Sequence, residues 1–409
     1  MSDYPFPLAD PGDQGRPPVP TTRWDEVAIR ARRAVALVAR PRRLAIVDSH
    51  FPWRLSGFRY HEAEEVFRRL PDTLFFSLYR LTDPFPAPVH PLAEFPRVAP
   101  AAGVTDVLMT FLNFSAGVLG VAADASVAPV PGARSDISLW PVLERWGIRA
   151  HATLYRGGGL FPDTTPDVLL ALGRRCTTVF TSVPEVVDVL PDAVATVVPV
   201  PGDFYARQPR PDDGPADLRL VFVGDDRPRK GLATLLDAMA DLGPGFSLDV
   251  VGPHERHGAR LEALGAVAHG WLAPAELRDV LGGADVVVAP ATSDRPEDGY
   301  GDTGMVDGFP TTAARVAMLS GCCLVGSNPT GEQSPIRPEE HYVAVPERDA
   351  GALVDALRWL KGHPEERRAI ARRGADAVRD WCDVAPVVAA KLARMGFLTD
   401  ADAGVVSGR

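Results

Sequence analysis

The segment from Leu218 to Leu232 reads Leu-Arg-Leu-Val-Phe-Val-Gly-Asp-Asp-Arg-Pro-Arg-Lys-Gly-Leu. Its first part is apolar, β-branched and aromatic, which predicts a buried strand that ends at Gly224. A polar turn follows, and helical spacing of apolar residues begins just after Lys230-Gly231. A turn from strand to helix presents unpaired amide groups and the positive end of a helix dipole. This segment is therefore a candidate anion site with Lys230 at its mouth, although many such turns bind no ligand.

Length and composition indicate a globular protein of two domains. The 409 residues exceed one ordinary core, and 46% hydrophobic with 23% charged residues is typical of soluble folds. A net charge of −10 without a long basic run argues against nucleic acid as a partner. Four cysteines lack metal-ligand spacing, and the chain has no signal-peptide segment and no run of about 20 apolar residues. These features predict a cytoplasmic protein without a transmembrane segment.

Strand patterns alternate with helical patterns in both halves of the chain. The strands that we expect are 43–48, 73–78, 106–112, 148–154, 177–182 and 195–200 in the first half, and 218–223, 247–251, 266–270, 285–289 and 322–326 in the second. This alternation predicts an α/β fold of two doubly wound parallel-sheet domains that face each other across a cleft.

The domain boundaries follow from composition. We expect a mobile N-terminal tail and an amphipathic helix laid against the first domain within 1–40, and the first domain at 41–206. A linker rich in proline and charge occupies 207–217, because its residues suit neither a sheet interior nor a buried helix. The second domain follows at 218–380, and a helix and tail end the chain at 381–409.

Five elements of the second half stand out by their order and spacing. They are Phe222-Val223-Gly224 with Pro228-Arg229-Lys230-Gly231-Leu232, Leu248-Asp249-Val250-Val251-Gly252, His269-Gly270-Trp271 with Glu276-Leu277, Ala284-Asp285-Val286-Val287-Val288-Ala289-Pro290, and Asp307-Gly308-Phe309-Pro310-Thr311-Thr312 with Ala317-Met318 and Gly321. Together they resemble the large retaining family of GT-B nucleotide-sugar glycosyltransferases, glycosyl transferases group 1. The first half is similar more loosely, through the loop at 51–58 and the segment at 198–204. The resemblance covers roughly residues 43–397.

The resemblance implies a GT-B fold of two Rossmann-like domains and a glycosyltransferase (EC 2.4, hexosyl or related). Such an enzyme moves a sugar from a nucleoside-diphosphate sugar to an acceptor hydroxyl with retention of configuration. It needs no bound cofactor and no metal, and residues 1–399 contain no Asp-x-Asp, the short acidic element of metal-dependent sugar transferases. The donor would bind the C-terminal domain. The acceptor, a saccharide, glycolipid or small molecule, would bind the N-terminal domain, to which the last helix returns.

The resemblance also implies roles for individual residues. Lys230, with Arg229 or Arg227, would neutralise the diphosphate, and amides at the start of the following signature helix would cap it. The implied catalytic residues are Lys230, Arg229 and Asp307. The implied donor-binding residues are Gly224, Arg227, Trp271, Leu272, Gly308, Phe309, Pro310, Thr311, Thr312 and Ala313, with Trp271 and Leu272 where the family holds the nucleobase.

Two departures from the family pattern matter. Asp225 stands where the family usually has Arg, and an acid is repulsive beside a diphosphate. The second signature Glu, which grips the ribose, is replaced by Val316 or Arg315, depending on whether one aligns on Ala317-Met318 or counts from Asp307. Neither replacement accepts hydrogen bonds from a diol through its side chain. Two alternatives therefore stay open: a catalytically inactive GT-B partner or scaffold protein, and a nucleotide-sugar epimerase or hydrolase.

The acceptor or sugar side is expected at the strand ends of the first half. Its candidate residues are Gly57, His50, Tyr155, Arg156 and Gly157. His50 is either a ligand-contacting residue or a structural histidine. The three glycines at 157–159 either allow close approach of a ligand or form a loop tip. The polar segment 294–302 is either a solvated loop or a lid over the donor sugar.

Overall fold

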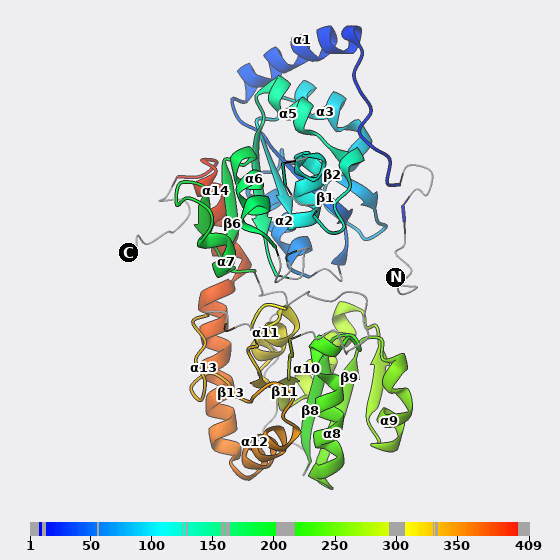
Figure 1. The fold of residues 1–409 in the computed structure, drawn as a ribbon, viewed down its shortest axis with the longest axis vertical. Helices are drawn as coiled ribbons and strands as arrows, with labels where there is room; N and C mark the ends of the chain where they lie inside the picture. Colours follow the sequence, from blue (N-terminus) through cyan, green and yellow to red (C-terminus); the bar gives the residue numbers. More distant parts are fainter. Residues whose placement is uncertain are drawn as a thin grey trace. The chain divides into compact units, whose positions relative to one another are not determined.

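A computed structural model describes residues 8–9, 14–54, 57–124, 126–127, 130–156, 160, 164–201, 217–293, 307–329, 331 and 334–399. The chain divides into two compact units (Figure 1). The N-terminal unit comprises Met1–Val200 with Val384–Arg409, and the C-terminal unit comprises Pro201–Asp383. The last helix of the chain therefore belongs to the N-terminal unit, while the expected linker at 207–217 lies outside the described residues except for its last position.

A seven-stranded parallel sheet forms the centre of the N-terminal unit, in the order β3-β2-β1-β4-β5-β6-β7. Its strands are β1 (Leu44–Phe51), β2 (Leu74–Arg80), β3 (Val89–Pro91), β4 (Asp106–Thr110), β5 (Arg149–Leu154), β6 (Thr178–Thr181) and β7 (Ala195–Val197). Because all neighbours are parallel, the carboxyl ends of these strands meet at one edge of the sheet.

Helices cover both faces of this sheet. They are α1 (Arg23–Ala39), α2 (Phe58–Arg69), α3 (Phe95–Ala101), α4 (Leu112–Val118), α5 (Trp140–Trp146), α6 (Pro166–Arg175), α7 (Pro184–Val187) and α14 (Val384–Arg394). Successive residues of β1 point to opposite faces: Ala45 and Val47 enter one apolar cluster, and Leu44 enters another with Val388 and Leu392 of α14. The sheet is thus buried on both sides, which explains its nearly continuous apolar strands.

The C-terminal unit repeats this architecture with six parallel strands in the order β10-β9-β8-β11-β12-β13. They are β8 (Leu218–Val223), β9 (Phe246–Val251), β10 (Val267–Gly270), β11 (Val286–Ala289), β12 (Cys323–Gly326) and β13 (Val343–Ala344). The helices are α8 (Leu232–Leu242), α9 (Gly258–Ala263), α10 (Pro274–Gly283), α11 (Thr312–Leu319), α12 (Ala350–Gly362) and α13 (Pro364–Cys382). Leu220 and Phe222 of β8 pack towards α8 and α12, whereas Val221 packs towards α11. The predicted α/β fold class is confirmed.

The local structure differs from the sequence analysis in three places. The strands β3 and β13 were not predicted, because runs of 3 and 2 residues carry no readable periodicity. The strand expected over 106–112 ends at Thr110, since Phe111 has a φ of 74° and leaves the extended path. The described part of the N-terminal segment is not a free tail. Ala9 N donates to the Arg80 carbonyl at 3.0 Å, and Gly15 N donates to the Leu78 carbonyl at 2.9 Å.

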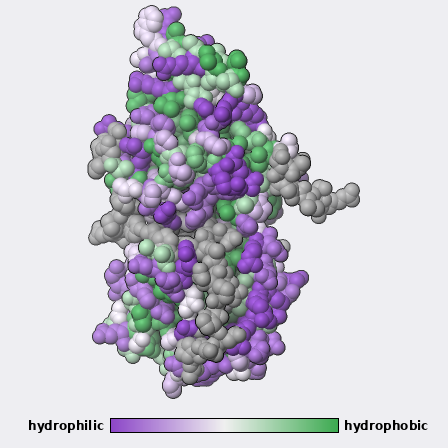
Figure 2. All heavy atoms as spheres, turned by 180° about the vertical axis from the view of Figure 1, so that it is seen from behind, coloured by the Kyte–Doolittle hydropathy of each residue, from purple (hydrophilic) through white to green (hydrophobic). Residues whose placement is uncertain are grey.

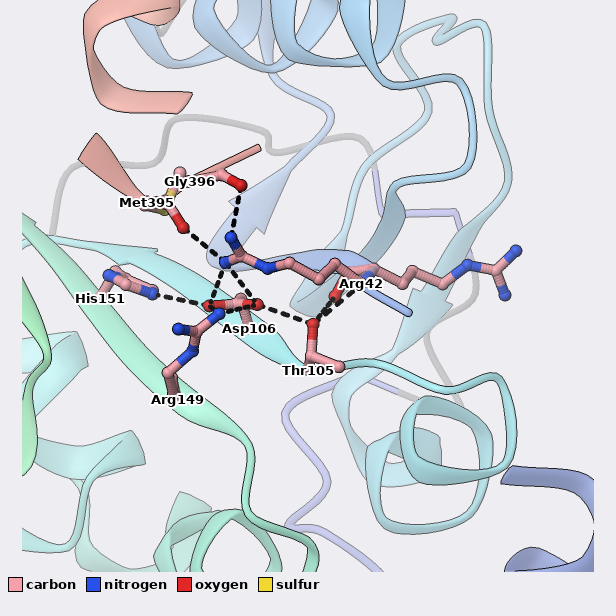
Figure 3. Close-up of polar contacts among 8 residues, drawn as sticks. Arg42, Thr105, Asp106, Arg149, His151, Met395 and Gly396 are labelled. Carbon is pink, nitrogen blue, oxygen red and sulfur yellow. Dashed lines mark hydrogen bonds and ion pairs between the residues drawn. The ribbon is translucent and has the colours of Figure 1, made fainter. Parts of the chain in front are cut away.

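A buried ionic cluster ties the end of α14 to the amino ends of β4 and β5 (Figure 3). Asp106 is fully buried and accepts from Arg149, His151 and Thr105, while Arg42 pairs with it at 3.1 Å. Arg42 also donates to the carbonyl groups of the two residues that follow α14. Burial would raise the pKa of Asp106, but these hydrogen bonds and charges outweigh it and lower the pKa to about 2.

All four cysteines are buried and none forms a disulfide bond. Burial raises the pKa of Cys176 and Cys323 to about 12. These thiols therefore pack as small apolar side chains rather than as nucleophiles.

Candidate functional site

The polar turn after β8 lies at the carboxyl edge of the C-terminal sheet and is fastened to the segment that follows β11. Thr292 N donates to the Arg229 carbonyl at 2.8 Å, and Thr292 Oγ1 donates to the Pro228 carbonyl at 3.0 Å. Residues Pro228–Lys230 form a single 3₁₀ turn between Gly224 and α8. Two strand ends are thereby joined at one position, where an open α/β sheet binds its ligands.

Gly231 allows this turn to lie close to the end of β11. Its φ is 74°, and a Cβ added there would lie 1.8 Å from the carbonyl oxygen of Pro290. Any larger residue would push the turn away from the end of β11, so glycine is required on both conformational and steric grounds. The preceding residue, Lys230, is held over Gly224, where an added Cβ would come within 3.5 Å of its Cδ.

Lys230 and Arg229 converge on the carboxylate of Asp307. Lys230 Nζ lies 2.9 Å from Asp307 Oδ2, and Arg229 Nε lies 3.4 Å from the same oxygen. Burial would raise the pKa of Asp307, but the charges of Lys230 and Arg229 outweigh it and hold the pKa below its usual value. The side chain of Arg229 is only 4% exposed, whereas that of Lys230 is 22% exposed. Lys230 is therefore the cation that a ligand can reach, whereas Arg229 is buried and pairs with the same carboxylate.

The start of α11 supplies a second source of positive potential. Thr311 is the N-cap residue, and its side chain accepts a hydrogen bond from Ala314 N at 3.2 Å. In an α-helix the amides of the first positions have no acceptor within the helix, so those of Thr312 and Ala313 are left to an anion. Asp307 lies just before this helix and pairs with Lys230. The structure thus brings the two predicted phosphate-binding elements together.

Three more predicted donor residues lie between Asp307 and the helix. Gly308 follows Asp307, and Phe309 is joined to Pro310 by a cis peptide bond. The ring of Phe309 is 5% exposed and packs against Tyr342, with ring centroids 5.0 Å apart. Phe309 therefore holds the segment to the core beneath α11.

Asp225, the acid where the family usually has Arg, is neutralised by its neighbour. Arg227 Nε donates to Asp225 Oδ2 at 2.8 Å, and Arg227 N donates to Oδ1 at 3.1 Å. Burial would raise the pKa of Asp225, but the hydrogen bonds from Arg227 and the charge of Lys230 lower it to about 2. Arg227 is thus engaged by Asp225, which leaves Lys230 as the main predicted phosphate ligand.

The structure distinguishes the two residues that replace the second signature Glu. Val316 is 6% exposed and its side chain belongs to the apolar cluster beneath α11. Arg315 is also buried, but its Nη2 donates to Thr312 Oγ1 at 3.1 Å and its guanidinium lies 5.7 Å from the centroid of the Trp381 ring. Arg315 therefore places a cationic group at the first turn of α11.

The predicted nucleobase residues follow β10. Gly270 accepts a hydrogen bond from Gly252 N at 2.8 Å, which joins the ends of β9 and β10. Trp271 is 53% exposed, and Leu272 packs partly against the cluster beneath α11. The possible lid at 294–302 lies outside the described residues.

Two of the candidates on the N-terminal side lie near the carboxyl end of β1. The ring of His50 stacks on Tyr79 with a centroid distance of 4.7 Å, and burial lowers the pKa of His50 below its ordinary value. Gly57 is the N-cap residue of α2 and has a φ of 54°. The sequence analysis missed an ion pair there: Arg59 Nη1 lies 2.6 Å from Asp48 Oδ1. The sequence did contain a signal for this ion pair: Asp48 lies near the end of a predicted strand, and Arg59 lies near the start of the helix that follows.

Tyr155 and Arg156 do not point freely from the end of β5. Tyr155 is 2% exposed, and its hydroxyl lies 2.8 Å from Lys391 Nζ and 3.3 Å from Glu62 Oε2. Arg156 pairs with Glu185 at 2.7 Å. The interpretation of Tyr155 as a sugar-contacting residue is therefore corrected, because its polar group is used inside the fold. Gly157 lies outside the described residues.

Comparisons with known proteins relate the C-terminal unit to a family. Residues 217–362 match the family model described as Glycosyl transferases group 1. A D-inositol 3-phosphate glycosyltransferase of Segniliparus rotundus is 30% identical over 217 residues, which is 47% of this chain and 42% of the relative. A phosphatidyl-myo-inositol mannosyltransferase of Mycobacterium leprae is 32% identical over 176 residues, which is 41% of this chain and 44% of the relative. The matches thus span less than half the length of these curated relatives.

Solved structures share the fold across most of the chain. The Anabaena HepE protein in complex with UDP-glucose superposes with a TM-score of 0.65 at 13% identity, covering 87% of this chain and 100% of HepE. Sucrose-phosphate synthase from Thermosynechococcus elongatus gives a TM-score of 0.59 at 16% identity, covering 87% and 99%. The chain therefore has a GT-B fold, and its residues 217–362 are similar to Glycosyl transferases group 1.

Proposed function

We propose that this protein transfers a sugar from a nucleoside-diphosphate sugar to an acceptor hydroxyl, with retention of configuration and without a metal or bound cofactor. The named relatives are a glycosyltransferase and a mannosyltransferase, and HepE structures hold UDP, glucose or UDP-glucose. These names support a nucleotide-sugar donor and make a UDP conjugate the first probe. The acceptor is expected on the N-terminal unit, near the Asp48–Arg59 pair and His50.

One observation carries the proposal: Lys230 pairs with Asp307, in the segment that leads into α11. In the transfer, the bond between the anomeric carbon and the diphosphate oxygen breaks, and the diphosphate leaves with the electron pair. The acceptor oxygen forms the new bond and gives up its proton. Groups that bind the growing negative charge more tightly in the transition state than in the ground state accelerate this step.

Asp307 prepares Lys230 for this role. The ion pair of 2.9 Å keeps the ammonium group at the sheet edge and joins it to the segment that leads into α11. A diphosphate that enters there meets a cation already in position and a helix amino terminus, so little reorganisation is required. Lys230, Arg229 and the helix dipole supply the positive charge that a divalent metal supplies elsewhere, which supports metal independence as part of the proposal.

The experiment is a thermal-shift titration with UDP, GDP, ADP, dTDP and their common sugar conjugates. A ligand that binds only the folded state at about 100 Kd stabilises it by about 2.7 kcal/mol. For a unit of this size that corresponds to a rise in Tm of roughly 5–10 °C. We expect one nucleotide class to produce this shift, and the matching sugar conjugate to be consumed when acceptors are supplied.

Two variants make the test specific. Lys230→Ala should remove most of the shift and of the transferase activity. Lys361→Ala is the matched control, since Lys361 lies against the ring of Phe246 at the amino edge of the same sheet, 4.7 Å from the centroid. A wild-type shift in Lys230→Ala would contradict the assignment of the phosphate site. The absence of any shift in the wild type would favour the inactive scaffold, and free sugar or an epimer without acceptor would favour the hydrolase or epimerase.

A further inference from the structure

The outward side of α1 is apolar. Trp24 is 84% exposed, Val27 58%, Val35 72% and Val38 89%, whereas Ile29 is the one buried residue that the helix contributes to the core. With about 3.6 residues per turn, these four side chains fall on one side of the helix. The remaining positions on that side are also apolar and exposed: Ala28, Ala31, Ala34 and Ala39. Helix α1 therefore lies against the first domain through its other side.

The side that faces the protein combines the buried Ile29 with charged residues that bond to the N-terminal unit. Arg33 Nη1 donates to the Val104 carbonyl at 2.8 Å, and Arg33 Nη2 donates to the Trp146 carbonyl at 3.0 Å. Glu26 pairs with Arg145 at the other end of the contact. Turning the apolar side inwards would break these bonds and bury unpaired charges, which costs far more than the exposed valines would gain.

Arginines border the apolar side. Arg23 and Arg30 lie along one border and Arg32 along the other, and all three are exposed. The acidic residues of the helix are already paired with arginines outside it, Asp25 with Arg97 at 3.5 Å and Glu26 with Arg145. This surface is therefore locally positive on a chain whose net charge is −10. Figure 2 shows hydrophobic and hydrophilic residues next to each other over the end of the N-terminal unit that carries α1.

We propose that α1 is a membrane-docking helix, which lies in the interface of a bilayer that contains anionic phospholipids. An apolar face bordered by arginines, with a tryptophan at its end, is the composition of helices that lie in this interface. The arginine stems can follow the apolar surface while the guanidinium groups reach lipid phosphates. Among the described residues, no helix has the length and apolar character to cross a membrane, so the contact is with the surface of the bilayer.

A second copy of the chain is the competing occupant. Two α1 helices packed face to face would bring arginine borders of the same sign together. The acids that could neutralise them, Asp25 and Glu26, are used within each chain. Anionic phospholipid supplies the missing negative charge, and for this reason charge complementarity favours a bilayer over self-association.

The test is flotation of the full chain with vesicles of phosphatidylcholine alone and of phosphatidylcholine mixed equally with phosphatidylglycerol. We expect binding to the mixed vesicles that weakens as salt is added. Arg30→Gln with Arg32→Gln should lower the partition coefficient about 30-fold, at about 1 kcal/mol for each charge. Trp24→Ser should lower it about 10- to 100-fold through the lost apolar burial.

Matched controls lie on the C-terminal unit. Arg368→Gln with Arg372→Gln removes two exposed arginines of α13, and Trp359→Ser removes a tryptophan of α12 that is 41% exposed. Both should bind vesicles as the wild type does, and all variants should keep the wild-type melting temperature because the altered side chains are exposed.

Three results would overturn the proposal. The first is a wild type that does not float with the mixed vesicles. The second is an equal loss of binding in the controls. The third is a dimer in gel filtration that Trp24→Ser dissociates, which would assign the face to self-association. No nucleotide sugar enters this assay, so its failure and the failure of the proposed transferase activity are separate outcomes.

Discussion

Replacing Lys391 should strongly destabilise the N-terminal unit. Lys391 lies on α14, and its Nζ is 2.6 Å from Glu62 Oε1 and 2.8 Å from the hydroxyl of Tyr155. The side chain of Lys391 is 2% exposed and that of Glu62 is 8% exposed. Lys391→Met keeps the length of the side chain and removes the charge, so the Glu62 carboxylate is left buried with the Tyr155 hydroxyl at 3.3 Å.

The magnitude follows from that burial. Removing one partner of a buried ion pair costs about 3–5 kcal/mol, because the remaining charge loses its compensation. For a unit of this size each kcal/mol lowers Tm by about 2–4 °C, so we expect a fall of roughly 6–20 °C. Arg394→Met is the control on the same helix. Arg394 makes exposed contacts with Thr196 and Ala193, and its loss should cost no more than about 1 kcal/mol.

Differential scanning calorimetry of the whole chain measures both variants, and the double variant Lys391→Met with Glu62→Gln completes the cycle. The double variant should be more stable than Lys391→Met alone, since no buried charge remains. A fall in Tm no larger than that of Arg394→Met would refute the reasoning, because it would mean that water reaches Glu62. A double variant less stable than the single one would show that packing, not charge, holds α14 in place.

Three further predictions follow from the geometry. Gly231→Ala should abolish nucleotide binding and lower Tm, because its Cβ would lie 1.8 Å from the Pro290 carbonyl oxygen; unchanged binding in the thermal-shift titration would contradict this. The pKa of Asp106 is lowered from 3.8 to about 2, so it contributes stability that is complete above pH 3.8 and is lost as the pH falls towards 2. Asp106→Asn should therefore flatten the acid limb of the stability curve by about 2 kcal/mol, as measured by urea unfolding at a series of pH values. Thr311→Val should cost about 1 kcal/mol through loss of the N-cap bond to Ala314, whereas Thr311→Ser should keep that stability in the same unfolding assay.

The strand and helix order could be predicted because it depends on local periodicity. In β8 the side chains of Leu220 and Phe222 go to one face and Val221 goes to the other, and helices cover both. A strand buried in this way must be apolar along its whole length, which is the pattern that the sequence displays. The same holds for the turn after it, where Gly231 marks a backbone position that only glycine can occupy.

The candidate site was predictable only in its parts. Lys230 and Thr311 were recognisable from their places at helix starts. The ion pair of Lys230 with Asp307, which joins the turn to the segment before Thr311, depends on the parallel order of β8, β11 and β12. Tyr155 was misread for a related reason: its place after β5 suggested a ligand, while its hydroxyl is bound by Lys391 of the last helix. Contacts between residues so distant along the chain leave no local signal.

Helix α1 shows most clearly which features follow from the sequence and which depend on the tertiary structure. The spacing of its apolar residues predicts an amphipathic helix, and the helix forms over Arg23–Ala39. Which side faces the protein was decided by Arg33, whose bonds to the Val104 and Trp146 carbonyls turn the apolar side outwards. The spacing of apolar residues along the sequence predicts that a helix has two different faces, because this spacing involves only residues that are close together in the chain. The partner of each face depends on groups that only the folded chain brings within hydrogen-bonding distance.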